Sequence, residues 1–156
     1  MTVIAWDGTT LAADRQMTTA GYKQSITKIF RLWDGRLVGA AGAVHVIQAF
    51  VEWMRNKDTV PACIQPNKDE KIIASGLEIL PDKTIHRYFI GISLTPVIIK
   101  DKYIAIGSGC EYAVGAMAAG ASAAEAVIIT NQHCNTCGMG VDALPLNLEL
   151  AVDKTA

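Results

Sequence analysis

The sequence has little charge of either sign and few aromatic residues. Charged residues make up 19% of its 156 residues and aromatic residues 6%, and the formal net charge is -1. Nucleic acids and anionic membranes are usually bound through a marked excess of positive charge, which this composition lacks. We therefore expect no nucleic-acid partner and no electrostatic binding to a membrane surface.

Long apolar runs and a recognisable leader are also missing. No apolar stretch is long enough to cross a bilayer, and the N-terminus shows no basic segment followed by an apolar one. We expect a cytoplasmic protein without a membrane partner. In that compartment the four cysteines, Cys63, Cys110, Cys134 and Cys137, are expected to be reduced thiols rather than a disulfide framework.

Apolar residues, in contrast, are abundant. They form 51% of the chain, and the mean hydropathy is +0.26. The length predicts one domain, spanning 1–156, with a sizeable core. Exposed apolar surface usually marks an interface, so we interpret the composition as that of a homo-oligomer; a well-filled sandwich core would be the alternative explanation.

The hydrophobic period changes along the chain from strand-like to helix-like and back. Turn signals at Asp7-Gly8 and Asp34-Gly35 predict two hairpins, within 2–14 and 26–41. The pattern predicts helices over 43–55, 111–119 and 122–131, and strands over 71–79, 84–90, 96–99, 103–106 and 142–152. This order predicts an α+β fold, in which two antiparallel sheets carry helices on their outer faces.

Thr2 is the most informative residue of the chain. A small second residue permits removal of Met1, which would make Thr2 the N-terminus. A free N-terminal threonine combines a hydroxyl nucleophile with an α-amine base, whose unperturbed pKa of about 7.7–8.0 needs only a modest downward shift for work near neutrality. The alternative is an ordinary strand threonine that happens to follow the start methionine.

Three further residues fit such a nucleophile. Asp14 ends the strand that pairs with the N-terminal one, Lys28 opens the second hairpin, and Gly42 follows its end. A lysine charge beside Thr2 would lower the pKa of its hydroxyl and its amine, and Asp14 would hold that lysine in place. A glycine N–H would bind an oxyanion. Singly, the three residues are better explained by a strand-end cap, a surface lysine and a tight turn.

Together, this ordered set resembles the proteasome β-subunit family and its HslV branch. The matching segments are TVIA at 2–5, LAAD at 11–14, ITKI at 26–29, VGAAG at 38–42 and AIGSGCEYA at 105–113. The resemblance implies the four-layer αββα sandwich of N-terminal nucleophile (Ntn) hydrolases, and a threonine endopeptidase that needs no cofactor.

The resemblance also implies roles for individual residues. Thr2, Asp14, Lys28 and Gly42 fall on the catalytic positions, and Ser108 falls on the serine that assists the N-terminal amine. Two small apolar residues, Ala40 and Val44, fall in the substrate pocket, which implies a preference for apolar side chains before the scissile bond.

For partners, the resemblance implies stacked homo-oligomeric rings that enclose the Thr2 sites. Such a chamber would admit unfolded polypeptide, so an ATP-dependent unfoldase is the companion it implies. No residue of the chain identifies that unfoldase.

The segment 134–140 departs from the family. Its members carry an aspartate and then a serine here, and Asn135 is a possible replacement for the aspartate. This loss motivates an alternative function, a catalytically weak or silent ring protein with a structural or binding role. His133, Cys134 and Cys137 could bind Zn²⁺, although the sequence offers no fourth ligand, and a redox dithiol is another possibility. We expect ordinary loop or buried thiols and no metal.

Overall fold

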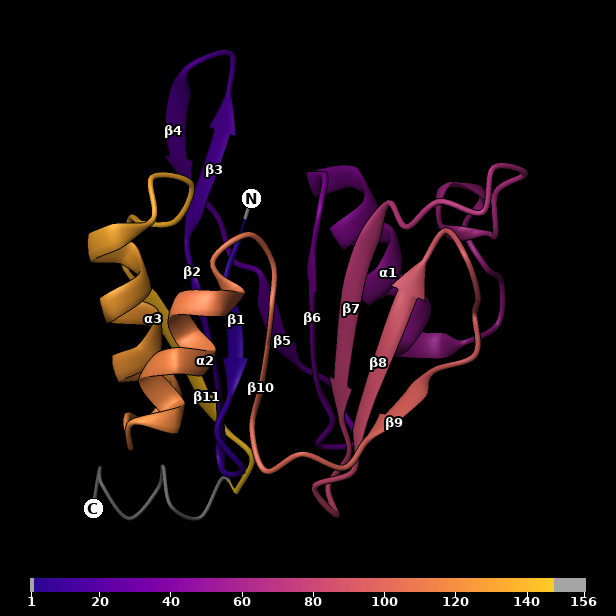
Figure 1. The fold of residues 1–156 in the computed structure, drawn as a ribbon. Coiled ribbons are helices and arrows are strands. Elements are labelled where there is room, and N and C mark those ends of the chain that lie inside the picture. Colours follow the sequence, from indigo (N-terminus) through magenta and orange to yellow (C-terminus); the bar gives the residue numbers. More distant parts are fainter. Residues whose placement is uncertain (1, 148–156) are drawn as a thin grey trace.

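In the computed structural model, which describes residues 2–147, two antiparallel sheets pack face to face (Figure 1). The first sheet has the order β10-β1-β2-β11, with bounds Ile104–Ile106, Ile4–Trp6, Thr10–Asp14 and Val141–Pro145. The second has the order β5-β6-β7-β8-β9, with bounds Ile29–Arg31, Leu37–Ala41, Ala74–Ile79, Ile85–Ile90 and Val97–Ile99.

Helices cover the outer face of each sheet. Helix α1 (Val44–Asn56) lies on the five-stranded sheet, whereas α2 (Cys110–Ala118) and α3 (Ala123–His133) lie on the four-stranded one (Figure 1). A short 3₁₀ turn, η1 (Ala62–Ile64), follows α1. None of the helices in this part of the chain is long and apolar enough to span a membrane.

Strand alternation separates the core into layers. In β6, Leu37 and Ala41 face the other sheet, while Val38 and Ala40 face α1, because successive side chains of a strand point to opposite faces. A third cluster joins the four-stranded sheet to α2 and α3 through small residues, which allow these helices to approach closely. The result is the expected αββα sandwich.

The structure also contains a hairpin that the sequence pattern did not predict. Strands β3 (Gln16–Thr19) and β4 (Tyr22–Ser25) form a separate two-stranded sheet that projects from the sandwich (Figure 1). All four residues of β4 are exposed, so the hairpin has no alternating apolar face that could have marked it. The last strand, predicted over 142–152, is β11; positions 148–152 lie outside the described residues.

Helix α3 begins at a capping box that the sequence also contains. The Ser122 hydroxyl accepts a hydrogen bond from the Glu125 backbone at 3.2 Å, and the Glu125 carboxylate accepts one from the Ser122 backbone at 3.5 Å. Asp7, in the β1–β2 turn, accepts a further bond from the Ala123 N–H at 2.8 Å. The Asp7 contact fixes the start of α3 against the β1–β2 hairpin, which Thr2 directly precedes.

A buried carboxylate, Glu78 on β7, connects the second sheet to the end of α1. Arg36 donates to Glu78 at 2.6 Å and to the Met54 carbonyl at 2.8 Å, while His86 and Tyr88 each lie 3.0 Å from the other carboxylate oxygen. Burial by itself raises the pKa of Glu78, but the hydrogen bonds from Arg36 and His86 bring it below its ordinary value.

Glu78→Gln should therefore destabilise the fold by about 2–3 kcal/mol at neutral pH, since the Arg36 guanidinium then keeps only the more exposed Asp34 carboxylate as an ionic partner. Because the folded-state pKa is depressed, this stabilisation exists above the unfolded pKa and disappears as pH falls through the folded one. Urea unfolding should show the difference from wild type at neutral pH and a smaller one at about pH 3. The exposed Glu52→Gln is the control, with an expected change under about 0.5 kcal/mol.

Candidate active site

The β1–β2 hairpin brings Asp14 beside Thr2. Thr2 directly precedes β1, and Asp14 is the last residue of β2, which pairs with β1 in the register Ile4↔Ala13. Two bonds extend this pairing: the Asp14 N–H donates to the Val3 carbonyl at 3.2 Å, and the Val3 N–H donates to the Asp14 carboxylate at 3.1 Å. The carboxylate therefore points toward the start of the chain.

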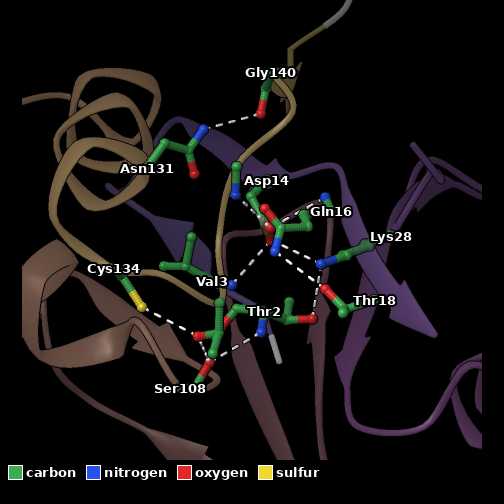
Figure 2. A network of polar contacts seen from close by, with 12 residues as sticks. Thr2, Val3, Asp14, Gln16, Thr18, Lys28, Ser108, Asn131, Cys134 and Gly140 are labelled. Carbon is green, nitrogen blue, oxygen red and sulfur yellow. Dashed lines mark hydrogen bonds and ion pairs between the residues drawn. The ribbon is translucent and has the colours of Figure 1, made fainter. Parts of the chain in front are cut away.

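Lys28, which immediately precedes β5, joins both residues. Its Nζ donates to Thr2 Oγ1 and to Asp14 Oδ1, each at 2.9 Å (Figure 2). The three side chains are almost fully buried, with exposed fractions of 1%, 0% and 1% for Thr2, Asp14 and Lys28. A buried ammonium needs a negatively charged partner to replace the water it has lost. The Asp14 carboxylate is that partner, and it allows Lys28 to lie beside the Thr2 hydroxyl.

Backbone N–H groups complete the shell around the Asp14 carboxylate. Its second oxygen accepts bonds from Gln16 and Gly138, both at 3.2 Å, in addition to the bonds from Val3 and Lys28 to the first. A carboxylate with this many donors is fixed in orientation. It can therefore hold the Lys28 ammonium in one position.

Ser108 approaches Thr2 from the other neighbour of β1. It follows β10, and its Oγ accepts a hydrogen bond from Thr2 N at 3.1 Å. That nitrogen is a peptide N–H while Met1 is attached, and it becomes the α-amine once Met1 is removed. Gly107 permits this approach, because its φ is +97° and a Cβ there would lie 2.1 Å from the Thr2 carbonyl oxygen.

A cavity of about 570 Å³ opens beside Thr2 and Lys28. Gly42 and Val44 are among its lining residues, and β3 adds a wall that sequence reasoning missed. The other lining residues are Gln16, Met17, Thr18, Thr19, Ile26, Ala43, His45 and Ile47. The only feature of the sequence that could have indicated that β3 lines this cavity is that it follows Asp14 almost directly.

The prediction for Ala40 needs correction. Ala40 is fully buried and packs under α1 with Val38 and Phe50, because the alternation of β6 turns it away from the cavity. Gly42 lies one residue beyond β6, where a Cβ would come within 2.7 Å of the Ala74 side chain. This position therefore accepts only glycine without movement of β7. The proposed oxyanion role of the Gly42 N–H stays a prediction.

Comparison with solved structures identifies the fold. The structure is similar to the BPH protein of Thiobacillus denitrificans, with a TM-score of 0.69 at 21% identity over 94% of this chain and 98% of that one. It is also similar to BPH in complex with epoxomicin (TM-score 0.70, 21% identity, 94% and 100% covered). Eukaryotic HslV from Trypanosoma brucei gives a TM-score of 0.68 at 20% identity, over 92% and 97%.

The chain has the HslV fold. No protein-family model matches its sequence, and no curated protein does. The expected likeness to HslV and the expected αββα Ntn-hydrolase architecture are therefore confirmed at the level of fold, through structure rather than through sequence similarity.

Within this HslV fold, the loop after α3 carries a contact that sequence reasoning missed. Thr136 Oγ1 lies 2.9 Å from Ser108 Oγ and 3.1 Å from Cys134 Sγ. The backbone carbonyl of Asn135, the residue proposed as a replacement for the aspartate, accepts a bond from the Gln16 side chain at 3.3 Å. The hydroxyl that meets Ser108 from this loop thus belongs to Thr136, one residue further along.

The three residues considered for Zn²⁺ have other neighbours. The His133 ring stacks on Tyr112 with 6.3 Å between ring centroids, and Cys137 is buried beneath α3. Over residues 2–147, no group of three or more histidine, cysteine, aspartate or glutamate side chains is arranged to hold a metal ion. The donor set thus does not fit a tetrahedral zinc centre, which requires four converging ligands.

Proposed function

We propose that this chain is an N-terminal threonine peptidase of the proteasome-like type. One observation carries the proposal: a buried Lys28 ammonium lies 2.9 Å from the Thr2 hydroxyl and 2.9 Å from the Asp14 carboxylate. An ion pair needed only for stability would not require the hydroxyl of the second residue. The further contact of Thr2 N with Ser108 supports the same assignment, since this nitrogen would be the base.

The proposed reaction starts after removal of Met1. The Thr2 amine takes the proton from Oγ1, and the oxygen attacks a peptide carbonyl carbon while Lys28 stabilises its developing negative charge. The Gly42 N–H would donate to the oxyanion. The amine then returns the proton to the leaving nitrogen as the C–N bond breaks, and water hydrolyses the resulting ester on Oγ1.

The cavity supports a substrate with an apolar side chain before the scissile bond. Met17, Ile26, Val44 and Ile47 give its wall an apolar part next to Thr2. An extended peptide would place one side chain there while its carbonyl meets the nucleophile. We therefore propose unfolded polypeptide as the substrate.

We test the peptidase assignment by labelling with epoxomicin, the molecule bound in one of the BPH structures. Intact mass should show a chain that lacks Met1 and carries one epoxomicin, located on Thr2. A trimmed, folded protein that gains no adduct would favour the alternative, a silent ring protein whose loop 134–140 no longer supports the nucleophile. Retention of Met1 in protein that hydrolyses peptides would overturn the assignment of Thr2.

We also propose that the chain assembles into stacked homo-oligomeric rings. Helices α2 and α3 form one outer layer of the sandwich. Their outward faces carry four large apolar side chains that are exposed in the single chain, namely Tyr112, Val114, Ile128 and Ile129. Such side chains favour burial between subunits. A ring would confine the Thr2 sites, and an ATP-dependent unfoldase would then be needed to deliver substrate.

Light scattering at micromolar concentration tests the assembly. A ring should give a mass many times the 16.7 kDa of one chain. Replacing Ile128 by glutamate should reduce that mass, because it places a charge on the proposed contact face. Glu111→Gln, an exposed position on the neighbouring helix α2, is the control for surface changes. A monodisperse species of 16.7 kDa would contradict the ring.

A further inference from the structure

A line of polar contacts leads from the nucleophile to a pair of cysteines. Thr2 N donates to Ser108 Oγ at 3.1 Å, Ser108 Oγ lies 2.9 Å from Thr136 Oγ1, and Thr136 Oγ1 lies 3.1 Å from Cys134 Sγ. Figure 2 shows Cys134 and Ser108 on the same side of Thr2. The nitrogen of Thr2, the proposed base, is thus connected to the Cys134 thiol through the hydroxyls of Ser108 and Thr136.

Cys134 and Cys137 are placed to form a disulfide. The Cys137 N–H donates to the Cys134 carbonyl at 3.2 Å, which closes a turn. A turn of this kind holds the first and fourth Cα atoms within about 7 Å, and disulfides span roughly 4.4–6.8 Å between Cα atoms.

The two thiols differ in the way a reactive pair requires. Cys134 is partly exposed; burial by itself raises the pKa of its thiol, but hydrogen bonds with Thr136 and Cys137 bring the pKa below its ordinary value. Cys137 is 3% exposed, and burial together with the Asp14 charge raises its pKa to about 12. Cys134 is therefore the thiol that meets an oxidant first, and Cys137 is shielded until Cys134 has reacted.

We propose that Cys134 and Cys137 form a reversible disulfide that lowers the reactivity of Thr2. The oxidant is a small-molecule disulfide. Cys134 attacks one of its sulfurs as a thiolate and expels one thiol, and Cys137 then attacks the Cys134 sulfur and expels the second. The protein thiols lose two electrons and two protons, and the reagent is reduced to two thiols.

The disulfide would act on Thr2 through Thr136. Bonded to Cys137, the Cys134 sulfur has no S–H and is drawn from Thr136 toward its new partner. Thr136 then loses one of its two side-chain contacts, and its hold on Ser108 weakens. Cys137 also packs against Gly109, whose N–H donates to the Thr2 carbonyl at 3.2 Å, so a shift of its sulfur would reach Thr2 by a second route.

The effect of the disulfide on activity rests on the proposed peptidase function, whereas the formation of the disulfide does not. The experiment therefore measures disulfide formation and Thr2 activity separately. A Cys63→Ser/Cys110→Ser chain, in which only the proposed pair remains, is treated with oxidised glutathione, freed of the reagent and then treated with dithiothreitol. Mass spectrometry of the peptide holding Cys134 and Cys137 reports the bond as a loss of two hydrogen atoms. Peptide hydrolysis and epoxomicin labelling report Thr2.

We expect the bond to form, and hydrolysis to fall by at least about fivefold, the factor for losing one hydrogen bond of about 1 kcal/mol. Dithiothreitol should restore the rate. Cys134→Ser, which keeps a hydroxyl beside Thr136 but cannot form the bond, should have the same rate before and after oxidation.

Three results would overturn the proposal. The first is the absence of the bond after oxidation, and the second is a bond that leaves the rate unchanged. The third is an equal loss of rate in Cys134→Ser, which would place the effect elsewhere. If the reduced chain neither hydrolyses peptides nor reacts with epoxomicin although the bond forms, then the peptidase function fails together with its control, and only the disulfide is supported.

Discussion

Thr2→Ala should abolish peptide hydrolysis and epoxomicin labelling without unfolding the protein. The substitution removes Oγ1, the atom that forms the ester, and loss of a catalytic nucleophile lowers the rate by roughly 10,000-fold or more. The remaining contacts of the site do not need this atom: Lys28 keeps its 2.9 Å ion pair with Asp14, and the Val3 bond to Asp14 is unchanged. The variant should therefore stay folded.

Rates with an apolar peptide substrate, together with circular dichroism, test this prediction. Thr2→Ser is the matched control, because it keeps the hydroxyl and the free amine after removal of Met1, and it should retain measurable hydrolysis. Equal rates for wild type and Thr2→Ala would show that the activity has another nucleophile or comes from a contaminant.

Lys28→Met should lower both activity and stability. Methionine keeps the length and apolar stem of lysine but leaves the buried Asp14 carboxylate without its cation, which destabilises a fold by about 3–5 kcal/mol. Backbone donors from Val3, Gln16 and Gly138 still reach Asp14, so we expect the lower end of this range. Hydrolysis should fall by roughly 100-fold or more, since the developing charge on Thr2 loses its stabilising partner.

A second variant separates catalysis from folding. Lys28→Met/Asp14→Asn removes both charges, so urea unfolding should show a smaller loss of stability than in Lys28→Met alone, while hydrolysis stays low. Lys23→Met, on the exposed strand β4, controls for loss of a lysine and should change neither property. If the double variant recovered activity together with stability, Lys28 would be a structural residue only.

The parts of the site that the sequence predicted belong to short, strongly patterned segments. A hairpin turn at Asp7-Gly8 with apolar strands on both sides places Asp14 beside the chain start, because antiparallel pairing fixes which residues are opposite. Lys28 was proposed from its place at the start of the second hairpin and then from the resemblance to a known family, and Ser108 was proposed from that resemblance alone. In the structure, Lys28 Nζ lies 2.9 Å from Thr2 Oγ1, and Ser108 Oγ lies 3.1 Å from Thr2 N.

The parts that were missed depend on contacts that leave no local pattern. Strand β4 is exposed throughout, and β3 has Met17 as its only apolar residue, so periodicity could not reveal the hairpin or its share of the cavity wall. Ala40 was predicted to line the pocket. Neighbouring side chains of β6 point to opposite faces of the sheet, and the side chain of Ala40 lies on the face that packs against α1. Thr136 contacts Ser108, which is 28 positions away in the sequence, and the loop that carries Thr136 has no hydrophobic periodicity that could have indicated this contact.

The sequence by itself predicted the order and type of the elements of the two packed sheets and their helices, the αββα class, and Thr2, Lys28 and Asp14 as a candidate nucleophile, ammonium and carboxylate. These depend on local turns, on periodicity and on residue chemistry, which act over a few neighbouring positions. Only the tertiary structure decided that Lys28 and Ser108, which are 26 and 106 positions from Thr2, meet its two reactive atoms. Contacts over such separations depend on how the sheets pair and pack, and packing selects among many arrangements that the same local pattern allows.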